Sequence, residues 1–240
     1  MRRAGLLLWI VLAIVPDLGA AAETLRLVAE EMAPLSMAGP GKDGVTGIAT
    51  EVIDTALARS RISRTVSLYP WAQAYDMALH RHDTCIYSTS RTEERIPRFK
   101  WVGPVVHDRW VLFGRIDGPA PATLDEAHGA SIGGHYAGAL TAYLESLGFV
   151  VDKKNDYHSN MVLVAEHRLD YTAAGLLAGA YAISRDKDLA DIVPVLAFKD
   201  SDLYLACNRS VPDRVVDRLN AALTRMNADG TTAAILRRYQ

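Results

Sequence analysis

The segment from Ser88 to Arg95, Ser-Thr-Ser-Arg-Thr-Glu-Glu-Arg, brings hydroxyl groups and cations together within a short stretch of sequence. An apolar strand is expected to end here, and a short helix is expected to begin near Thr92. Backbone N–H groups at a helix start, together with the hydroxyl groups of Ser88 and Ser90, favour an anionic partner. The planar guanidinium group of Arg95 can hold a carboxylate through two parallel hydrogen bonds, and Arg91 adds a second cation beside it. The segment therefore predicts a carboxylate site.

The same segment also fits a plainer interpretation. Ser90 or Thr92 can cap a short helix, because a side-chain oxygen at that position accepts from an unpaired backbone N–H group. The charged residues around it would then form solvated ion pairs of little energetic weight. From the residues alone, a carboxylate site and a helix cap both remain open.

A second candidate segment contains Gly133, Gly134, His135 and Tyr136. The two glycines are expected to form the turn between a strand and a helix that begins at about His135. Such a turn allows a ligand to approach the backbone closely at the positive end of a helix. The alternative is an ordinary tight turn. The segment lacks the third glycine and the acidic residue of a dinucleotide-binding fingerprint.

Two further candidates lie at the expected ends of strands. Trp71 follows Pro70 directly, where a side chain at the edge of a cleft is expected. The acidic pair Glu30 and Glu31 follows the first strand, and Glu31 is taken as a candidate ligand-binding residue. A solvated loop is the alternative for this acidic pair.

Motifs for catalysis and metal binding are missing from the sequence. It contains no nucleophile elbow, no phosphate-binding loop and no His or Cys cluster with zinc-site spacing. We therefore expect a protein that is not an enzyme and that needs neither a cofactor nor a metal. The formal net charge of −2 argues against binding to nucleic acid.

The order of predicted elements alternates short apolar strands with helices, which is typical of an α/β protein. An alternating strand at 25–29 leads into a helix at 48–57, and a strand at 65–69 leads into a helix at 71–80. Two helices, 211–227 and 231–239, are expected at the end of the chain.

The pattern is interrupted near residue 117 by the sequence Asp-Gly-Pro-Ala-Pro. It predicts two α/β lobes joined by extended crossings near 111–116 and 196–202. One lobe is expected to contain residues 23–112 and 200–240, and the other residues 113–199.

The first residues have the order of a secretory leader. Arg2 and Arg3 precede an apolar run from Leu6 to Val15, and small residues end at Ala22. Residues 1–22 are therefore expected to be a cleaved signal peptide, and a retained membrane anchor is the alternative. Its removal changes the formal net charge from −2 to −3, because two positive charges and one negative charge are lost. No other apolar stretch approaches membrane length, so we expect a periplasmic protein without membrane insertion.

Two cysteines, Cys85 and Cys207, lie in apolar segments that are expected to be strands. In an oxidising compartment they can form one disulfide. Two buried free thiols are the alternative, and the sequence does not decide between the two states.

The motifs taken together resemble bacterial extracellular solute-binding proteins of family 3. The resemblance rests on the order of segments along nearly the whole chain after the leader. These segments are Glu31-Met-Ala-Pro, Gly47-Ile-Ala-Thr-Glu-Val-Ile, Pro70-Trp-Ala-Gln-Ala, Ser88 to Arg95, Trp101-Val-Gly-Pro, His167-Arg-Leu-Asp and Arg237-Arg-Tyr.

This resemblance implies a periplasmic-binding-protein type II fold, with two α/β lobes joined by a two-strand hinge. It also implies a monomer that delivers a small polar carboxylate ligand to an inner-membrane ABC permease. Arg95 matches the arginine that clamps the ligand carboxylate, with Ser88 and Ser90 at the matching hydroxyl positions. His135 and Tyr136 match a turn of the second lobe that contacts the same carboxylate.

One departure from the family pattern bears on the ligand. Amino acid binders of this family carry an acidic residue for the ligand ammonium shortly after the Arg-Leu-Asp segment, and this place falls at or near Gly175. The expected ligand is therefore a small carboxylate or dicarboxylate, or a zwitterion whose ammonium group is held by Glu30 or Glu31. An enzyme similar to cyclohexadienyl dehydratases and a ligand sensor are the alternative functions on the same scaffold.

Overall fold

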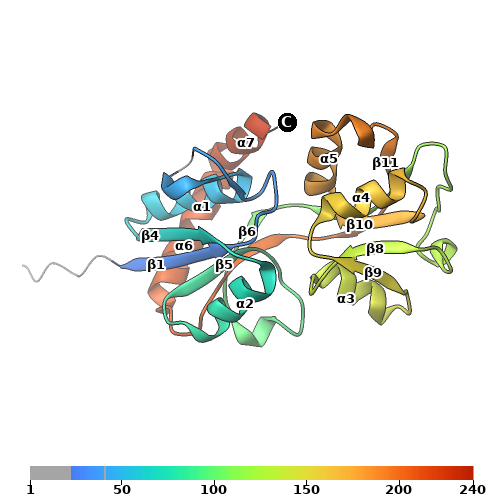
Figure 1. Cartoon of the computed structure of the whole chain (residues 1–240). Helices are drawn as coiled ribbons and strands as arrows, with labels where there is room; N and C mark the ends of the chain where they lie inside the picture. The colour runs from blue at the N-terminus through green and yellow to red at the C-terminus, as the bar shows by residue number, and fades with distance from the viewer. Residues whose placement is uncertain (1–22, 41, 240) are drawn as a thin grey trace, which may run out of the picture.

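The computed structural model describes residues 23–40 and 42–239, so the expected leader at 1–22 lies outside the described residues. Two five-stranded mixed sheets form two lobes (Figure 1). No helix in the described ranges is long and apolar enough to span a bilayer. The expected two-lobed α/β architecture is confirmed.

The first lobe contains a sheet with the strand order β4-β1-β5-β12-β6. Its strands are β1 (Thr24–Ala29), β4 (Ser63–Leu68), β5 (Thr84–Ser90), β6 (Lys100–Val106) and β12 (Leu203–Cys207). Its helices are α1 (Ile48–Arg59), α2 (Trp71–His80), α6 (Asp213–Ala228) and α7 (Thr231–Leu236), and a small ribbon is formed by β2 (Met37–Ala38) and β3 (Val45–Thr46).

Apolar side chains cover both faces of this first sheet, because successive residues of a strand point to opposite sides. Leu27 packs in a cluster with residues of α1 and α6. Its neighbour Val28 packs in a second cluster with residues of α2. The sheet is therefore buried between helices, and side chains reach solvent or the other lobe mainly at the ends of its strands.

The second lobe contains a sheet with the strand order β11-β7-β10-β8-β9. Its strands are β7 (Arg109–Arg115), β8 (Ile132–His135), β9 (Val151–Lys154), β10 (Tyr171–Gly175) and β11 (Ile192–Asp200). Helix α3 (Ala139–Ser146) packs on one face of this sheet, whereas α4 (Tyr157–Ala165) and α5 (Leu176–Arg185) pack on the other.

The chain passes between the two sheets twice, at 107–108 and at 201–202. These two crossings run side by side (Figure 1), and the Ser201 N–H group donates to the Asp108 carbonyl oxygen at 2.9 Å. The sequence predicted the crossings near 111–116 and 196–202. Those residues instead pair with each other as β7 and β11 inside the second sheet, so the crossings lie closer to the first lobe.

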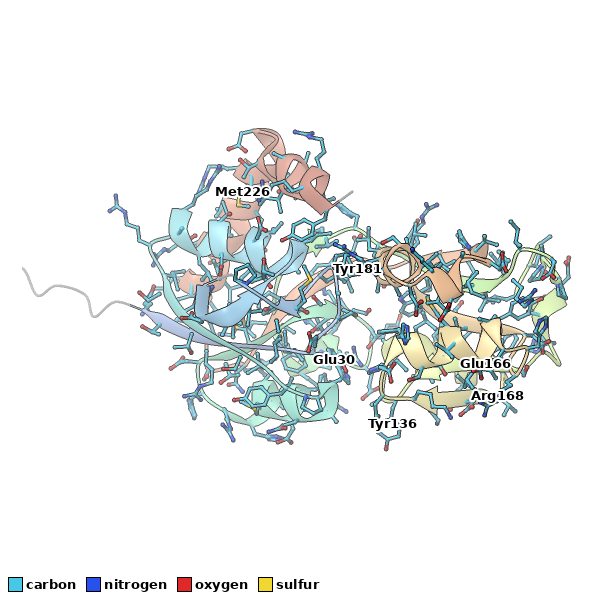
Figure 2. The ribbon with its side chains drawn as sticks, turned by 45° about the horizontal axis from the view of Figure 1, so that its top comes forward. Glu30, Tyr136, Glu166, Arg168, Tyr181 and Met226 are labelled. Atoms are coloured by element: carbon cyan, nitrogen blue, oxygen red, sulfur yellow. A yellow bond between two sulfur atoms is a disulfide. The ribbon has the colours of Figure 1, made fainter. Side chains whose placement is uncertain are left out.

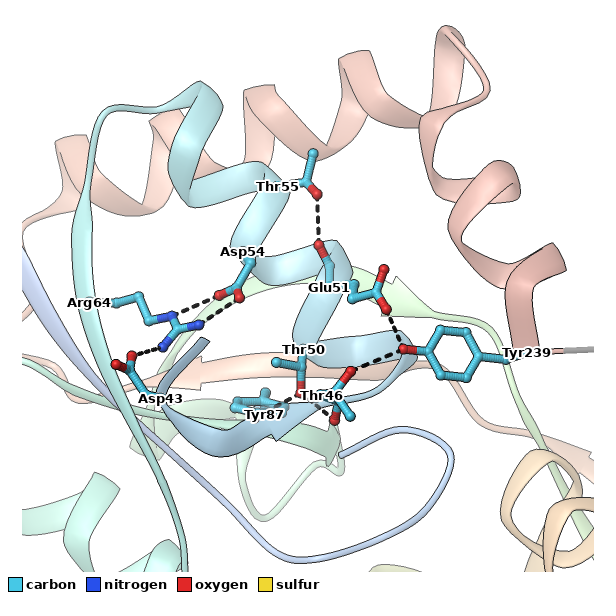
Figure 3. A network of polar contacts seen from close by, with 9 residues as sticks. All are labelled: Asp43, Thr46, Thr50, Glu51, Asp54, Thr55, Arg64, Tyr87 and Tyr239. Atoms are coloured by element: carbon cyan, nitrogen blue, oxygen red, sulfur yellow. Dashed lines mark hydrogen bonds and ion pairs between the residues drawn. The ribbon is translucent and has the colours of Figure 1, made fainter. Parts of the chain in front are cut away.

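A polar network fixes α1 to the first sheet (Figure 3). The Arg64 side chain is only 3 % exposed, and its guanidinium group donates to Asp54 at 2.6 and 2.7 Å and also contacts Asp43. The hydroxyl groups of Thr50 and Tyr87 lie 3.1 Å apart, and burial raises the pKa of Tyr87 to about 12. This buried arginine is balanced by two carboxylates, which is how most buried charges are held.

Cys85 and Cys207 form a disulfide between β5 and β12, with their Cα atoms 3.9 Å apart. The sequence left this question open. The bond joins the first half of the chain to the strand that returns from the second lobe.

Candidate ligand-binding site between the lobes

A cavity of about 60 Å³ lies between the lobes. Its charged side chains are Glu30, Arg95, Asp108 and His135. Its polar side chains are Ser88, Ser90, Thr141, Tyr157 and Ser201, and its apolar walls are formed by Met32, Leu35, Trp71, Trp110, Leu140, Ala173, Ala178 and Leu203. A hollow in which charged and polar groups converge among apolar walls is typical of a ligand site.

Arg95 brings a buried charge to this cavity without a carboxylate partner. It is 9 % exposed, and among the ion pairs of the described residues none includes its guanidinium group. The group lies over the rings of Trp71 and Tyr75, with 5.2 Å from Cζ to each ring centroid, and donates to the Ser90 carbonyl oxygen at 3.5 Å. Burial lowers the pKa of Arg95 because it disfavours the charged form, although an arginine remains protonated in a protein.

Ser88 points its hydroxyl group into the same region from a β-bulge. Tyr87 and Ser88 of β5 together face the single residue Leu205 of β12, and Ser88 has a φ of 57°. Bulges redirect side chains next to functional sites, and positive φ is uncommon outside glycine. Ser88 is 8 % exposed, and its Oγ atom has no hydrogen-bond partner within the part of the chain that the structure describes. Such a group is available to a ligand.

Ser90 lies at the end of β5, next to the second crossing. Its Oγ atom is 3.3 Å from Oγ of Ser201. The two hydroxyl groups line the cavity between the arginine and the crossing strands.

The expected helix near Thr92 is not formed. The chain makes a turn in which Arg95 N–H and Ile96 N–H both donate to the Thr92 carbonyl oxygen, followed by the short 3₁₀ helix η2 (Ile96–Arg98). Pro97 fits only the first turn of a helix, because it has no N–H group for an interior hydrogen bond. The backbone N–H groups expected from this segment therefore do not come from a helix start.

The second lobe instead places the start of α3 at the cavity. Gly138, Ala139, Leu140 and Thr141 all line it. The first N–H groups of a helix have no partner within the helix and carry partial positive charge. The cavity therefore has anion-binding groups on both lobes.

The glycine pair of the second lobe has a different place from the one expected. Gly133 and Gly134 are not a turn but belong to the buried strand β8. A Cβ atom at Gly134 would lie 2.6 Å from Oγ1 of Thr141, and one at Gly133 would lie 2.8 Å from Oδ1 of Asn160. These glycines allow α3 and α4 to pack closely on the strand, and the cavity is lined instead by His135 at the end of β8 and by residues 138–141 after it.

Tyr136 does not face the cavity. It is 57 % exposed and lies at the edge of the second lobe (Figure 2), where it borders an outer groove with Glu31 and Trp71 of the first lobe. His135 lies one position earlier, so the alternation of the strand sends the two side chains to opposite sides.

An acidic residue does enter the cavity after β1, but it is Glu30 rather than Glu31. Glu30 Oε1 accepts from His135 Nε2 at 3.0 Å, with side chains that are 16 % and 7 % exposed. Glu31 is exposed and accepts from the Ala38 N–H group at 3.4 Å. Burial opposes a charge on His135, but the hydrogen bond and the charge of Glu30, together with backbone hydrogen bonds to Asn155 and Tyr136, outweigh burial and raise its pKa. The ion pair joins the two lobes, because Glu30 follows β1 of the first lobe and His135 ends β8 of the second.

Asp108 is a cavity residue that the sequence did not indicate. It lies in the first crossing, and its Oδ1 atom accepts from the N–H groups of Arg109 at 2.8 Å and Leu177 at 3.2 Å. Burial raises the pKa of Asp108 to about 6. A Cβ atom at Gly175 would overlap Oδ2 of Asp108. No sequence motif marks Asp108, because its position depends on the path of the crossing.

Aromatic residues contribute unequally to the cavity. Trp71 lines it at the start of α2, and Trp110 of β7 lies opposite on the second lobe. Arg91 lies outside, with its guanidinium carbon 5.9 Å from the ring centroids of both Trp101 and Tyr204. The predicted second cation therefore stacks on aromatic rings instead of entering the cavity.

Other contacts hold the lobes together in this structure. Leu177 of α5 packs against the main apolar cluster of the first lobe. Tyr181 lies at the junction of the lobes (Figure 2), where its hydroxyl group is 3.9 Å from Sδ of Met37. These contacts and the Glu30–His135 ion pair show that the two lobes are closed on each other in this structure.

No cluster of three or more His, Cys, Asp or Glu residues within 23–40 and 42–239 is arranged to hold a metal ion. The side chains that line the cavity can bind a ligand through hydrogen bonds and charge. Two charged groups face the cavity from different segments, the Arg95 guanidinium group and the Asp108 carboxylate. Neither has an ion-pair partner among the described residues.

Comparisons with known proteins agree on the fold. No protein-family model and no curated protein sequence matches the chain. Among solved structures, a histidine kinase sensor domain with similarity to periplasmic binding proteins matches with a TM-score of 0.82 at 18% identity, over 91% of this chain and 96% of that chain. The arginine-, lysine-, histidine-binding protein ArtJ from Geobacillus stearothermophilus matches with a TM-score of 0.78 at 13% identity, over 90% and 95%.

A third match is the substrate-binding protein of an ABC uptake transporter from Streptococcus pneumoniae with bound histidine, with a TM-score of 0.75 at 14% identity, over 90% of this chain and 92% of that chain. At these identities the likeness shows the fold. The chain has the periplasmic-binding-protein type II fold, as the sequence motifs predicted.

Proposed function

We propose that this protein is an extracytoplasmic solute-binding protein that closes on a small ligand carrying a carboxylate and delivers it to an ABC importer. The observation that carries this proposal is the buried Arg95 guanidinium group, which faces the interlobe cavity and has no carboxylate partner among the described ion pairs. A buried charge without a partner is unfavourable, and a ligand carboxylate compensates for it.

The groups around Arg95 fit this ligand. The free hydroxyl group of Ser88 can donate to a carboxylate, and the first turn of α3 adds backbone N–H groups from the other lobe. Only the closed arrangement brings both sets to one ligand, so binding favours closure. A closed form stabilised by ligand is what an importer can distinguish from the empty protein.

The disulfide supports an extracytoplasmic location, because such bonds persist in oxidising compartments. This agrees with the leader expected at residues 1–22. Delivery to an importer rests on the likeness to transporter substrate-binding proteins.

A ligand-sensing domain is the second candidate, because a histidine kinase sensor domain matches nearly the whole chain. In both functions the ligand binds in the same cavity. They differ in the membrane protein that recognises the closed form, which is an importer in one case and a signalling receptor in the other. Deletion of the gene would abolish uptake of the ligand if the protein serves an importer, and would leave uptake intact if the protein serves a sensor.

The binding function is tested by thermal melting of the purified protein with a panel of L-amino acids and of carboxylates without an amino group. A ligand at 100 times its dissociation constant raises the stability by about 2.7 kcal/mol. We expect a shift for at least one carboxylate-bearing compound, its loss in Arg95→Ala, and its retention in Arg91→Ala, which removes a cation outside the cavity. A carboxylate-bearing ligand that binds Arg95→Ala as tightly as the wild type would contradict the proposal.

A further inference from the structure

The cavity holds two charges of opposite sign that lack ion-pair partners. Arg95 is one, and Asp108 is the other, since no ion pair of residues 23–40 and 42–239 includes its carboxylate. The two come from different segments, the turn after β5 and the first crossing. Two complementary charges left in one small space match a ligand that carries both charges itself.

We propose that the ligand is a zwitterionic α-amino acid with a short, uncharged side chain, and that Asp108 binds its ammonium group while Arg95 binds its carboxylate. This inference rests on the proposed binding function. It assigns the ammonium site to the crossing between the lobes.

The geometry of Asp108 leaves one oxygen for this role. Its Oδ1 atom accepts two backbone N–H groups, one of them from Leu177 in the first turn of α5. Its Oδ2 atom lies where a Cβ atom of residue 175 would be, and both Gly175 and Asp108 line the cavity. Gly175 therefore provides the space that the carboxylate occupies at the end of β10. Any larger residue at position 175 would displace Asp108.

The charge state of Asp108 suits an ammonium partner. Burial raises its pKa to about 6, so the carboxylate is ionised at pH 7 but is poorly compensated. A ligand cation at hydrogen-bond distance would compensate this charge, as Arg95 is compensated by the ligand carboxylate.

The remaining charged groups of the cavity exclude a charged ligand side chain. Glu30 and His135 are already paired with each other at 3.0 Å. The walls beside them include Met32, Leu35 and Leu140. A charged side chain placed here would lose its hydration without a free partner.

The helix-capping role of Asp108 is the alternative explanation for its position, and Asp108→Asn separates the two. Asparagine keeps an Oδ1 acceptor for the N–H groups of Arg109 and Leu177 but removes the charge. If Asp108 only caps α5, the substitution leaves ligand binding almost unchanged.

The test is calorimetric titration of wild type, Asp108→Asn and the control Asp76→Asn, whose exposed carboxylate pairs with His80 at 2.9 Å. The probes include two pairs, L-alanine with propionate and L-valine with 3-methylbutanoate, and the members of each pair differ only in the amino group. Ethylamine is added as a probe that has the amino group but no carboxylate. We expect the wild type and the control to prefer the amino acids, and Asp108→Asn to bind them roughly 10- to 100-fold more weakly without losing propionate affinity.

A second variant moves the carboxylate. Asp108→Ala combined with Gly175→Asp places the acid directly on the end of β10, where φ is −66° and therefore suits aspartate, which also favours the position before a helix. We expect it to recover the preference for L-alanine over propionate.

The outcomes separate this inference from the proposed function. If the wild type binds propionate as tightly as L-alanine and Arg95→Ala loses both, the ammonium assignment is wrong and the carboxylate-binding function stands. If none of these carboxylate-bearing probes binds the wild type but another compound of the wider panel does, this inference is wrong and the carboxylate-binding function stands; if no carboxylate-bearing compound of the panel binds, both are wrong.

Discussion

The two charged ends of the interlobe cavity differ in how their charges are balanced. At one end, Glu30 and His135 neutralise each other across the lobes at 3.0 Å. At the other end, Arg95 and Asp108 face the cavity without ion-pair partners in the described part of the chain. A paired charge favours the closed arrangement that brings it together, whereas an unpaired buried charge is unfavourable until a ligand arrives. The comparison assigns lobe closure to one end and ligand recognition to the other.

The largest effect is expected from Arg95→Met, which replaces the guanidinium group with an apolar side chain. Binding of a carboxylate ligand should weaken by about 100-fold or more, because the ligand carboxylate is then desolvated without a cation. The ligand-free variant should melt at the same temperature as the wild type or higher, since an uncompensated buried charge is removed. Calorimetry and thermal melting check the two parts. Loss of stability with unchanged affinity would show that Arg95 is structural.

The next effect concerns pH and Asp108. Its pKa of about 6 means that the carboxylate gains a proton as the pH falls from 7 to 5, and the ligand ammonium then loses its partner. L-alanine, which stays zwitterionic over this range, should bind roughly tenfold more weakly at pH 5 than at pH 7. Calorimetry at the two pH values checks this, and Asp108→Asn should remove the decrease. A decrease of the same size in the variant would assign it to another group.

A smaller effect is expected from Glu30→Gln, which removes one charge of the interlobe pair and keeps its shape. The pKa of His135 is raised in the folded protein, so the pair stabilises the closed form below the ordinary histidine value of 6.5 and this stabilisation is lost as the pH rises through the raised pKa. We expect the ligand-free variant to be less stable than the wild type by about 1 kcal/mol at pH 5.5 and by less at pH 8.5.

Thermal melting at these two pH values measures the difference. This dependence has the opposite sign to that of ligand binding through Asp108. An equal difference at both values would argue against an ion pair that depends on protonated His135.

The smallest effect is expected from Tyr136→Ala. The side chain is 57 % exposed and does not line the cavity, so affinity and stability should change by no more than about 0.5 kcal/mol. A large loss of affinity would place Tyr136 at the site through a conformational change that the structure does not contain.

Local sequence patterns predicted much of the fold. The strand expected at 25–29 and the helices expected at 48–57 and 71–80 correspond to β1, α1 and α2. These elements have a clear apolar period, because one face or both faces pack on a core. Proline and glycine made other boundaries uncertain, and Gly133 with Gly134 was read as a turn although close packing under α3 and α4 places the pair in β8.

The sequence indicated the part of the site that comes from one continuous segment. Ser88, Ser90 and Arg95 line the cavity together because they follow one another at the end of β5. Asp108 was missed because it meets Gly175 only after the chain crosses between the lobes. The pattern singled out Glu31, whereas Glu30 lines the cavity, since successive side chains after a strand point to opposite sides.

The central claim is tested most directly by a crystal structure of the protein with L-alanine bound. We predict the ligand carboxylate within hydrogen-bond distance of the Arg95 guanidinium group and Ser88 Oγ, the ammonium group at Asp108 Oδ2, and an intact Glu30–His135 ion pair. A ligand that instead separates Glu30 from His135, with Arg95 and Asp108 still without partners, would contradict the division between recognition and closure.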